Sequence, residues 1–172
     1  PKELPNNKRV QFEKFFVLCE NLGGDFYYVD ECELDGKKYY LSFVSDVSGH
    51  GVGASMLSVL VKDIYNDYKN KVAQKEDLMP SLFLKRLNQK LLDLQLDGNK
   101  FITLFFILMD MEEKTVYYSS AGHPGMVLIR ENEEIIFYNI KNAPPLGIVS
   151  QFEYHDDRFE FRKNDKFILY TD

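Results

Sequence analysis

Two aspartates flank a stretch that has the pattern of a β-hairpin, and their placement suits metal chemistry. Asp25 precedes the run 26–34, and Asp46 follows the run 37–45. Between the runs, Asp35-Gly36 favours a two-residue turn, because Asp and Gly are common where φ must be positive. This turn sets Asp25 opposite Asp46, with Cβ atoms roughly 4.5–5.5 Å apart. Facing carboxylates raise each other's pKa unless a cation neutralises them, so the pair predicts a metal site.

Two other interpretations of these aspartates stay open at this point. A β-bulge would shift the pairing by one residue and send the two side chains to opposite faces of the sheet. Asp is also frequent at strand ends, because turns begin there. The residue types that follow Asp46 add weight to the metal site.

A glycine-rich loop follows Asp46, with the sequence VSGHGVG at positions 47–53, and leads into a helical pattern. Such a loop lets the backbone approach a ligand closely and can direct free N–H groups at an anion. It lacks the GxxxxGK[ST] pattern of a P-loop. A sharp chain reversal explains the glycines equally well.

Apolar periodicity predicts the elements that must position these residues. Helices are expected at 53–71 and 80–96, the second starting at a proline. The polar, proline-punctuated residues 1–9 suggest a linker from an upstream segment, and 10–172 one domain. Strands are expected at 10–18, 26–34, 37–45, 101–109, 116–120, 126–130, 135–138, 159–162 and 166–170. The apolar run FITLFFILM at 101–109 predicts a strand buried on both faces.

Composition limits the classes of partner and compartment. The 172 residues are enough for a substantial core, and the formal charge of −6 argues against nucleic acid or an anionic membrane as main partner. The two cysteines, Cys19 and Cys32, lack CxxC spacing, which favours free thiols in a reducing compartment. No apolar run approaches the ~18 residues of a membrane span. We therefore expect a cytoplasmic protein with no membrane insertion in this segment.

Six motifs in order carry a family resemblance: GGDFY, DVSGHGVGASML, FITLFF, AGHPG, PPLG and LYTD. They resemble the metal-dependent protein phosphatases (PPM, type 2C-like), in particular the bacterial RsbU/SpoIIE-type serine/threonine phosphatases. The resemblance runs from about Gly23 to Asp172. It implies an α+β fold of two packed antiparallel sheets flanked by helices, an αββα sandwich. It also implies that the helices at 53–71 and 80–96 cover one sheet.

The same resemblance implies a site and a reaction. Asp25 and Asp46 match metal-liganding aspartates, Asp46 being the one that bridges two ions. Val47 matches a position that offers its backbone carbonyl to a metal, and Asp172 matches a further metal-liganding aspartate. Two divalent ions, Mn²⁺ or Mg²⁺, would activate a water that attacks phosphoserine or phosphothreonine. Oxygen-only ligands suit these ions better than zinc.

The histidines carry weaker expectations. His50 adjoins the expected metals and is a candidate for protonating the leaving group, although loop structure is the favoured role. The type 2C branch places its corresponding histidine where this chain has Ser48. We expect His123 to be a structural hydrogen-bonding residue and His155 to be solvated.

Two departures from the family pattern stand out. The family usually has a second Asp directly after FY; here Tyr28 occupies that position and Asp30 comes two residues later, which we interpret as variation around the metal ligands. The chain also stops at Asp172, where the family continues to another metal ligand. The C-terminal end of the family domain is therefore expected to be missing from this sequence.

The resemblance also implies partners: a phosphorylated anti-sigma-factor antagonist (STAS-type) as substrate, an upstream sensor or regulatory domain, and a homodimer. The main alternative is a non-catalytic relative that binds a phosphorylated regulatory protein. A diguanylate cyclase would share the GGDF letters, but DVSGHGVG has no place in that family. A purely structural domain would leave aspartates at the ends of two apolar strands unexplained.

Overall fold

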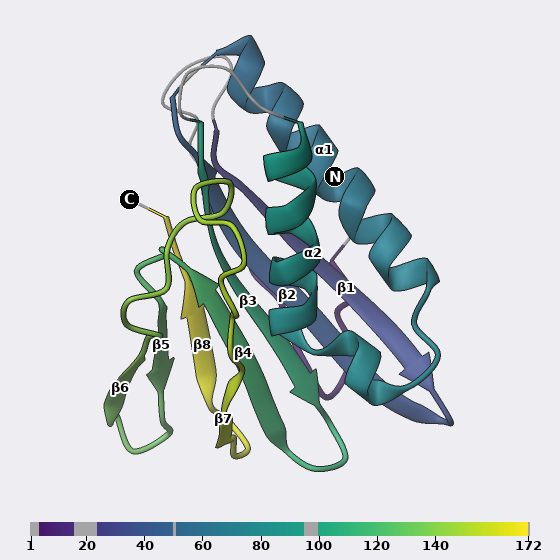
Figure 1. The fold of residues 1–172 in the computed structure, drawn as a ribbon. Coiled ribbons are helices and arrows are strands. Elements are labelled where there is room, and N and C mark those ends of the chain that lie inside the picture. Colours follow the sequence, from purple (N-terminus) through teal and green to yellow (C-terminus); the bar gives the residue numbers. More distant parts are fainter. Residues whose placement is uncertain (1–3, 16–23, 50, 95–99, 172) are drawn as a thin grey trace.

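The computed structural model describes residues 4–15, 24–49, 51–94 and 100–171, which form two antiparallel sheets with two long helices on one side (Figure 1). This confirms the expected α+β class. The larger sheet has the order β1-β2-β3-β4-β7 and the smaller one the order β6-β5-β8. The bounds are β1 Phe26–Leu34, β2 Lys37–Val47, α1 Val52–Asn70, the 3₁₀ helix η1 Lys75–Leu78, α2 Pro80–Asp93, β3 Ile102–Asp110, β4 Thr115–Ala121, β5 Met126–Ile129, β6 Ile135–Tyr138, β7 Asp157–Glu160 and β8 Lys166–Leu169.

The β1–β2 hairpin has the predicted turn and register. Asp35 and Gly36 have φ values of 51° and 73°, as a two-residue primed turn requires. Phe26 pairs with Ser45 at the open end of the hairpin, without a bulge in between. The next position of this register lies at Asp25 and Asp46.

Helices α1 and α2 cover one face of the larger sheet, as predicted. An aromatic cluster lies at this interface, where Phe83 of α2 stacks on Phe43 of β2 at 5.8 Å between ring centroids. Phe83 also meets Phe106 of β3 edge-on at 5.4 Å. Burial of these rings fixes the helix pair on the sheet, because each large aromatic side chain removes about 150–250 Å² from water.

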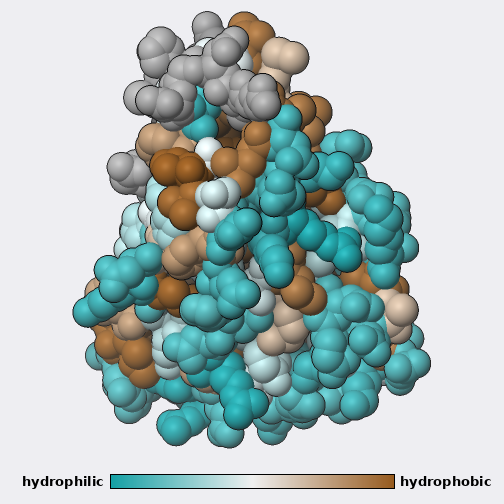
Figure 2. All heavy atoms as spheres, viewed as in Figure 1, coloured by the Kyte–Doolittle hydropathy of each residue, from teal (hydrophilic) through white to brown (hydrophobic). Residues whose placement is uncertain are grey.

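The other face of the larger sheet packs against the smaller sheet. Strand β3 is buried on both faces as predicted, since its side chains alternate between the helix side and this second core. The second core includes Phe105, Met126 and Tyr118, with Phe167 and Leu169 of β8 packed against it. The outer face of the smaller sheet keeps Ile135, Phe137 and Ile168 exposed, and Figure 2 shows apolar atoms on the surface near β6.

The expected strand at 10–18 is wrong for residues 10–15, which are irregular; residues 16–18 lie outside the described part of the chain. Local hydrogen bonds explain the difference. The Asn7 side-chain oxygen accepts from the N–H groups of Arg9 and Val10, and Asn6 accepts from Phe12. Asn side chains compete in this way with a strand ladder.

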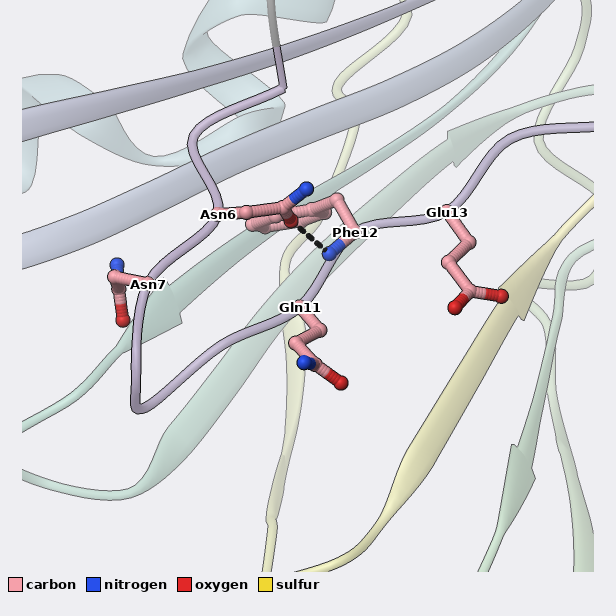
Figure 3. Close-up of a pocket in the computed structure, with 5 residues that line it drawn as sticks. All are labelled: Asn6, Asn7, Gln11, Phe12 and Glu13. Carbon is pink, nitrogen blue, oxygen red and sulfur yellow. Dashed lines mark hydrogen bonds between the residues drawn. The ribbon is translucent and has the colours of Figure 1, made fainter.

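This N-terminal segment still packs on the body of the protein. The Phe12 ring lies 5.7 Å from the Tyr40 ring, and the Asn7 amide donates to the Tyr40 hydroxyl. A shallow open pocket of about 260 Å³ runs along the segment (Figure 3). Its lining residues are Asn6, Asn7, Gln11, Phe12 and Glu13.

Strand β8 pairs with β5 in the smaller sheet and is not a neighbour of β2. Strands β2 and β8 therefore lie in different sheets. Two other differences are smaller: β7 begins two residues before the expected position, and the connector at 72–79 contains η1. No helix within the described ranges is long and apolar enough to cross a membrane.

Candidate metal site between the sheets

Asp25 and Asp46 lie at one end of the sandwich, on the face that looks toward the smaller sheet. Asp25 directly precedes β1, and Asp46 is the last residue but one of β2, where it pairs with Thr103. Side chains two residues apart in a strand share a face. Tyr27, two residues after Asp25, packs in the core between the sheets, so Asp25 and Asp46 point to that side.

The end of β8 reaches this same place from the other sheet. Thr171 Oγ1 donates a hydrogen bond to Asp25 Oδ2 at 3.0 Å. Figure 1 shows β8 running toward the end of the sandwich at which β1 begins. Asp172, the third expected carboxylate, follows Thr171 directly but lies outside the described residues. The contact comes about by packing of two sheets and not by strand adjacency.

A close backbone approach holds the carbonyl group of Val47 beside Asp25. A Cβ built on Gly24 would lie only 2.5 Å from the Val47 carbonyl oxygen, so residue 24 must be glycine for this approach. Helix α1 supports the same point, because Ser58 Oγ lies 3.4 Å from the Gly24 carbonyl oxygen. Val47 itself is buried at 1% exposure. The carbonyl expected at the metal therefore lies closely packed against the Gly24 backbone.

Ser48 anchors the glycine-rich loop to β3. Its N–H donates to the Phe101 carbonyl at 2.9 Å, and its hydroxyl accepts from the Phe101 N–H at 2.8 Å. Gly49 and Gly51 have φ values of 90° and 82°, which other residues adopt only with strain. The loop is therefore an ordered turn, and Ser48 stabilises it through these hydrogen bonds. His50 lies outside the described residues, so its expected role is not tested.

The site's donors are oxygens, which fits Mg²⁺ or Mn²⁺ better than zinc. Two carboxylates and one carbonyl come from residues that the structure describes. Within those residues, no group of three or more His, Cys, Asp or Glu side chains could hold a metal ion. Asp172 remains the candidate for a further ligand.

The two other histidines behave as expected. His123 is 3% exposed, and its Nδ1 accepts from the Gly125 N–H at 3.4 Å. Its carbonyl accepts from the Ser120 hydroxyl at 3.2 Å. His155 is exposed. His123 therefore serves the structure of its loop, which agrees with the sequence prediction.

Asp30 does not belong to the site, contrary to its interpretation as a variation around the metal ligands. It is paired with Leu41, five positions along β1 from Asp25. Its buried carboxylate forms an ion pair with Lys69 of α1, whose ammonium also donates to the Glu31 carbonyl at 2.9 Å. Asp30 thus ties the far end of α1 to the sheet.

Sequence reasoning missed Gly24, Ser58 and Thr171 as supports of the site. The signal for Thr171 was present, because it stands next to Asp172 in the LYTD motif. Gly24 stands next to Asp25 in GGDFY, and its role depends on a contact that only the folded hairpin shows. Ser58 looks like an ordinary polar position of α1.

Comparisons with known proteins agree with the motifs. Residues 36–172 match the family described as Stage II sporulation protein E (SpoIIE). Phosphoserine phosphatase RsbU of Bacillus subtilis is 24% identical over 99% of this chain, and the match covers 48% of RsbU. This chain thus spans about half the length of that relative.

Two solved structures share the fold. The SiaA-PP2C domain of Pseudomonas aeruginosa superposes with a TM-score of 0.67 at 19% identity, over 85% of this chain and 54% of that one. The catalytic domain of the serine threonine protein phosphatase PstP, solved in complex with 2 manganese ions, gives a TM-score of 0.61 at 14% identity, over 90% of this chain and 72% of that one. With the two-sheet fold, the opposed aspartates and the match over most of its length, the chain belongs to the SpoIIE family of PP2C-type phosphatase domains.

Proposed function

We propose that this chain is a metal-dependent protein phosphatase that hydrolyses phosphoserine or phosphothreonine with a metal-activated water. The observation that carries the proposal is the meeting of three segments at one end of the sandwich: Asp25 before β1, Asp46 near the end of β2 and Thr171 after β8. A structural domain has no need to bring two carboxylates together there, because like charges that face each other are destabilising.

The residues that would hold the ions are Asp25, Asp46, the Val47 carbonyl and Asp172. Two ions are expected, Mn²⁺ or Mg²⁺, and the manganese complex of the PstP catalytic domain, a protein of similar fold, supports this choice. When bound, such ions lower the pKa of a water molecule and neutralise charge on the phosphoryl oxygens.

The protein's own residues prepare this site. Thr171 orients the Asp25 carboxylate by donating to one of its two oxygens. Gly24 lets the Val47 carbonyl approach, and the Ser58 hydroxyl lies against the Gly24 carbonyl. No covalent nucleophile is needed, which agrees with Ser48 being engaged with Phe101. His50 is retained as a candidate donor of the proton to the leaving serine oxygen.

The substrate proposed is a phosphorylated regulatory protein, an anti-sigma-factor antagonist of STAS type, in a cytoplasmic partner-switching pathway. The relative named phosphoserine phosphatase RsbU supports phosphoserine as the substrate class. An upstream sensor or regulatory domain and a homodimer belong to the same proposal. The alternative is a relative that binds the phosphoprotein without hydrolysing it.

Mn²⁺-dependent phosphate release from a phosphoserine protein tests the proposal. We expect activity that EDTA abolishes and that Asp46→Asn lowers by at least about a thousandfold, because one ligand charge is lost at the ions. Asp63→Asn, an exposed carboxylate on α1, is the matched control and should leave activity unchanged. Full activity in Asp46→Asn would refute the mechanism. Binding of Mn²⁺ and phosphoprotein without hydrolysis would favour the binding-only alternative.

A further inference from the structure

Lys100 lies beside the glycine-rich loop, at the rim of the candidate metal site. The Ser48–Phe101 hydrogen bonds extend the β2–β3 ladder by one step beyond the pair of Val47 and Ile102. Lys100 directly precedes that step. It stands three residues before Thr103, the partner of Asp46, which corresponds to about 10 Å along an extended strand.

The Lys100 side chain extends over the beginning of α1. A Cβ on Gly53 would collide with the Lys100 ammonium nitrogen, so the ammonium lies against the first turn of that helix. Lys100 also precedes Ile102 by two residues, and Ile102 packs under the helices. Both observations place Lys100 on the helix side of the sheet, whereas Asp46 faces the smaller sheet.

Lys100 differs from the other partly buried lysines in having no counter-charge among the described residues. Lys69 pairs with Asp30, and Lys75 pairs with Asp110 and Glu113. The first turn of α1 contains no acidic residue, so it offers the Lys100 ammonium no counter-charge. In a chain of formal charge −6, this leaves a local cation against the start of α1.

We infer that Lys100 is a specificity-determining residue that binds an acidic side chain of the phosphoprotein, two to four residues from the phosphoserine. This rests on the proposed phosphatase function. An extended peptide rises about 3.3 Å per residue, so a residue three positions from the phosphoserine lies about 10 Å from it, similar to the backbone spacing expected between Lys100 and Thr103. Because Lys100 and Asp46 lie on opposite faces of the larger sheet, Lys100 binds the flanking acidic residue and not the transferred phosphoryl group.

A peptide series tests the inference. Phosphoserine peptides with Glu or Gln placed two, three or four residues from the phosphoserine, on either side, are compared in the wild type and in Lys100→Ala. For at least one Glu position we expect Lys100→Ala to raise KM roughly fivefold with little change in kcat, as for a partly solvated ion pair. The Gln peptides and p-nitrophenyl phosphate should be unaffected. Lys62→Ala, an exposed lysine on α1, is the matched control.

Charge reversal sharpens the test. Lys100→Glu should prefer a Lys-flanked peptide over the Glu-flanked one, which a merely structural lysine would not produce. Equal losses on all substrates, p-nitrophenyl phosphate included, would overturn the inference, as would no loss on any Glu peptide. A wild type that hydrolyses none of these substrates would instead count against the proposed phosphatase function.

Discussion

Thr171 and Asp25 are 146 positions apart in sequence, and the hydroxyl of the first donates to the carboxylate of the second at 3.0 Å. The bond connects the end of the smaller sheet to the start of the larger one. Because Asp25 is an expected metal ligand, the relative position of the two sheets controls the geometry of the site. We therefore expect changes in the packing between the sheets to alter metal binding.

Thr171→Val should weaken metal binding without unfolding the protein. Valine keeps the shape of threonine but cannot donate to Asp25, so the carboxylate loses its fixed orientation. Loss of such a supporting hydrogen bond lowers metal affinity by about 10–100-fold. Calorimetric titration with Mn²⁺ measures the change. Thr171→Ser retains the hydroxyl and should bind nearly as the wild type does; equal weakening in both variants would contradict the role given to this bond.

Gly24→Ala should displace the backbone of the candidate metal site. The added methyl group would meet the Val47 carbonyl at 2.5 Å, and relieving this clash must move either the carbonyl or Asp25. We expect a loss of about 1–3 kcal/mol in the free energy of unfolding, as for other overpacked positions, together with weakened Mn²⁺ binding.

Gly36→Ala is the matched control for that variant. It adds the same methyl group at the other end of the hairpin, where no atom of the described residues other than its chain neighbours lies within 4 Å, but strains a residue whose φ is +73°. It should lower stability and leave Mn²⁺ affinity unchanged. If Gly24→Ala binds Mn²⁺ like the wild type, the Val47 carbonyl is not fixed in the way we describe.

The hairpin that carries the aspartates was predictable because its signals are local. Asp35-Gly36 specifies the turn, the turn specifies the register, and the register sets Asp25 against Asp46. The helix α1 was predictable for the same reason, since its apolar side chains recur at helical spacing. In each case the residues of one segment are sufficient to predict its secondary structure.

The contacts that support the site were not predictable, because they join segments that are separate in the sequence. Nothing in residues 166–170 says that β8 pairs with β5 and that Thr171 then meets Asp25. The irregular path of residues 10–15 was missed because Asn6 and Asn7 satisfy backbone N–H groups locally, which outweighs a modest apolar content. Side-chain competition of this kind leaves no periodic pattern.

Tyr65→Phe should leave the protein as stable or make it more stable. Tyr65 is fully buried among aromatic rings, and its hydroxyl has no hydrogen-bond partner among the described residues. An unsatisfied buried polar group costs about 1–3 kcal/mol, so removing it should raise the free energy of unfolding by about 1 kcal/mol. Urea unfolding measures this.

Tyr68→Phe is the counterpart of that substitution, one helical turn further along α1. The Tyr68 hydroxyl donates to the Met79 carbonyl at 3.2 Å, so its removal leaves that carbonyl without the bond. We expect a loss of about 1 kcal/mol. A destabilised Tyr65→Phe would contradict the unsatisfied state of the Tyr65 hydroxyl.

An ion pair between Lys75 and Asp110 joins the segment between α1 and α2 to the β3–β4 turn. This ion pair predicts that the stability of the protein depends on pH. Lys75 Nζ lies 2.8 Å from Asp110 Oδ2, and the Asp110 side chain is 1% exposed. Burial alone would raise the pKa of Asp110, but hydrogen bonds from the Glu113 N–H and from Lys75 outweigh it and hold the pKa below its ordinary value. A depressed carboxyl pKa contributes stability above the unfolded-state pKa of about 3.9, and this contribution is lost as the pH falls through the folded-state pKa.

Lys75→Met should therefore cost most at neutral pH and progressively less in acid. It leaves the Asp110 carboxylate buried without its cation, which costs about 3 kcal/mol at pH 7. As the pH falls, Asp110 takes up a proton in the variant, so the difference from the wild type shrinks. Urea unfolding at pH 7, 5 and 3.5 measures it. Lys71→Met breaks an exposed pair with Asp67 and should change stability little at any of these values. A Lys75→Met deficit that stays constant with pH would show that lost packing, and not the unpaired carboxylate, is its cause.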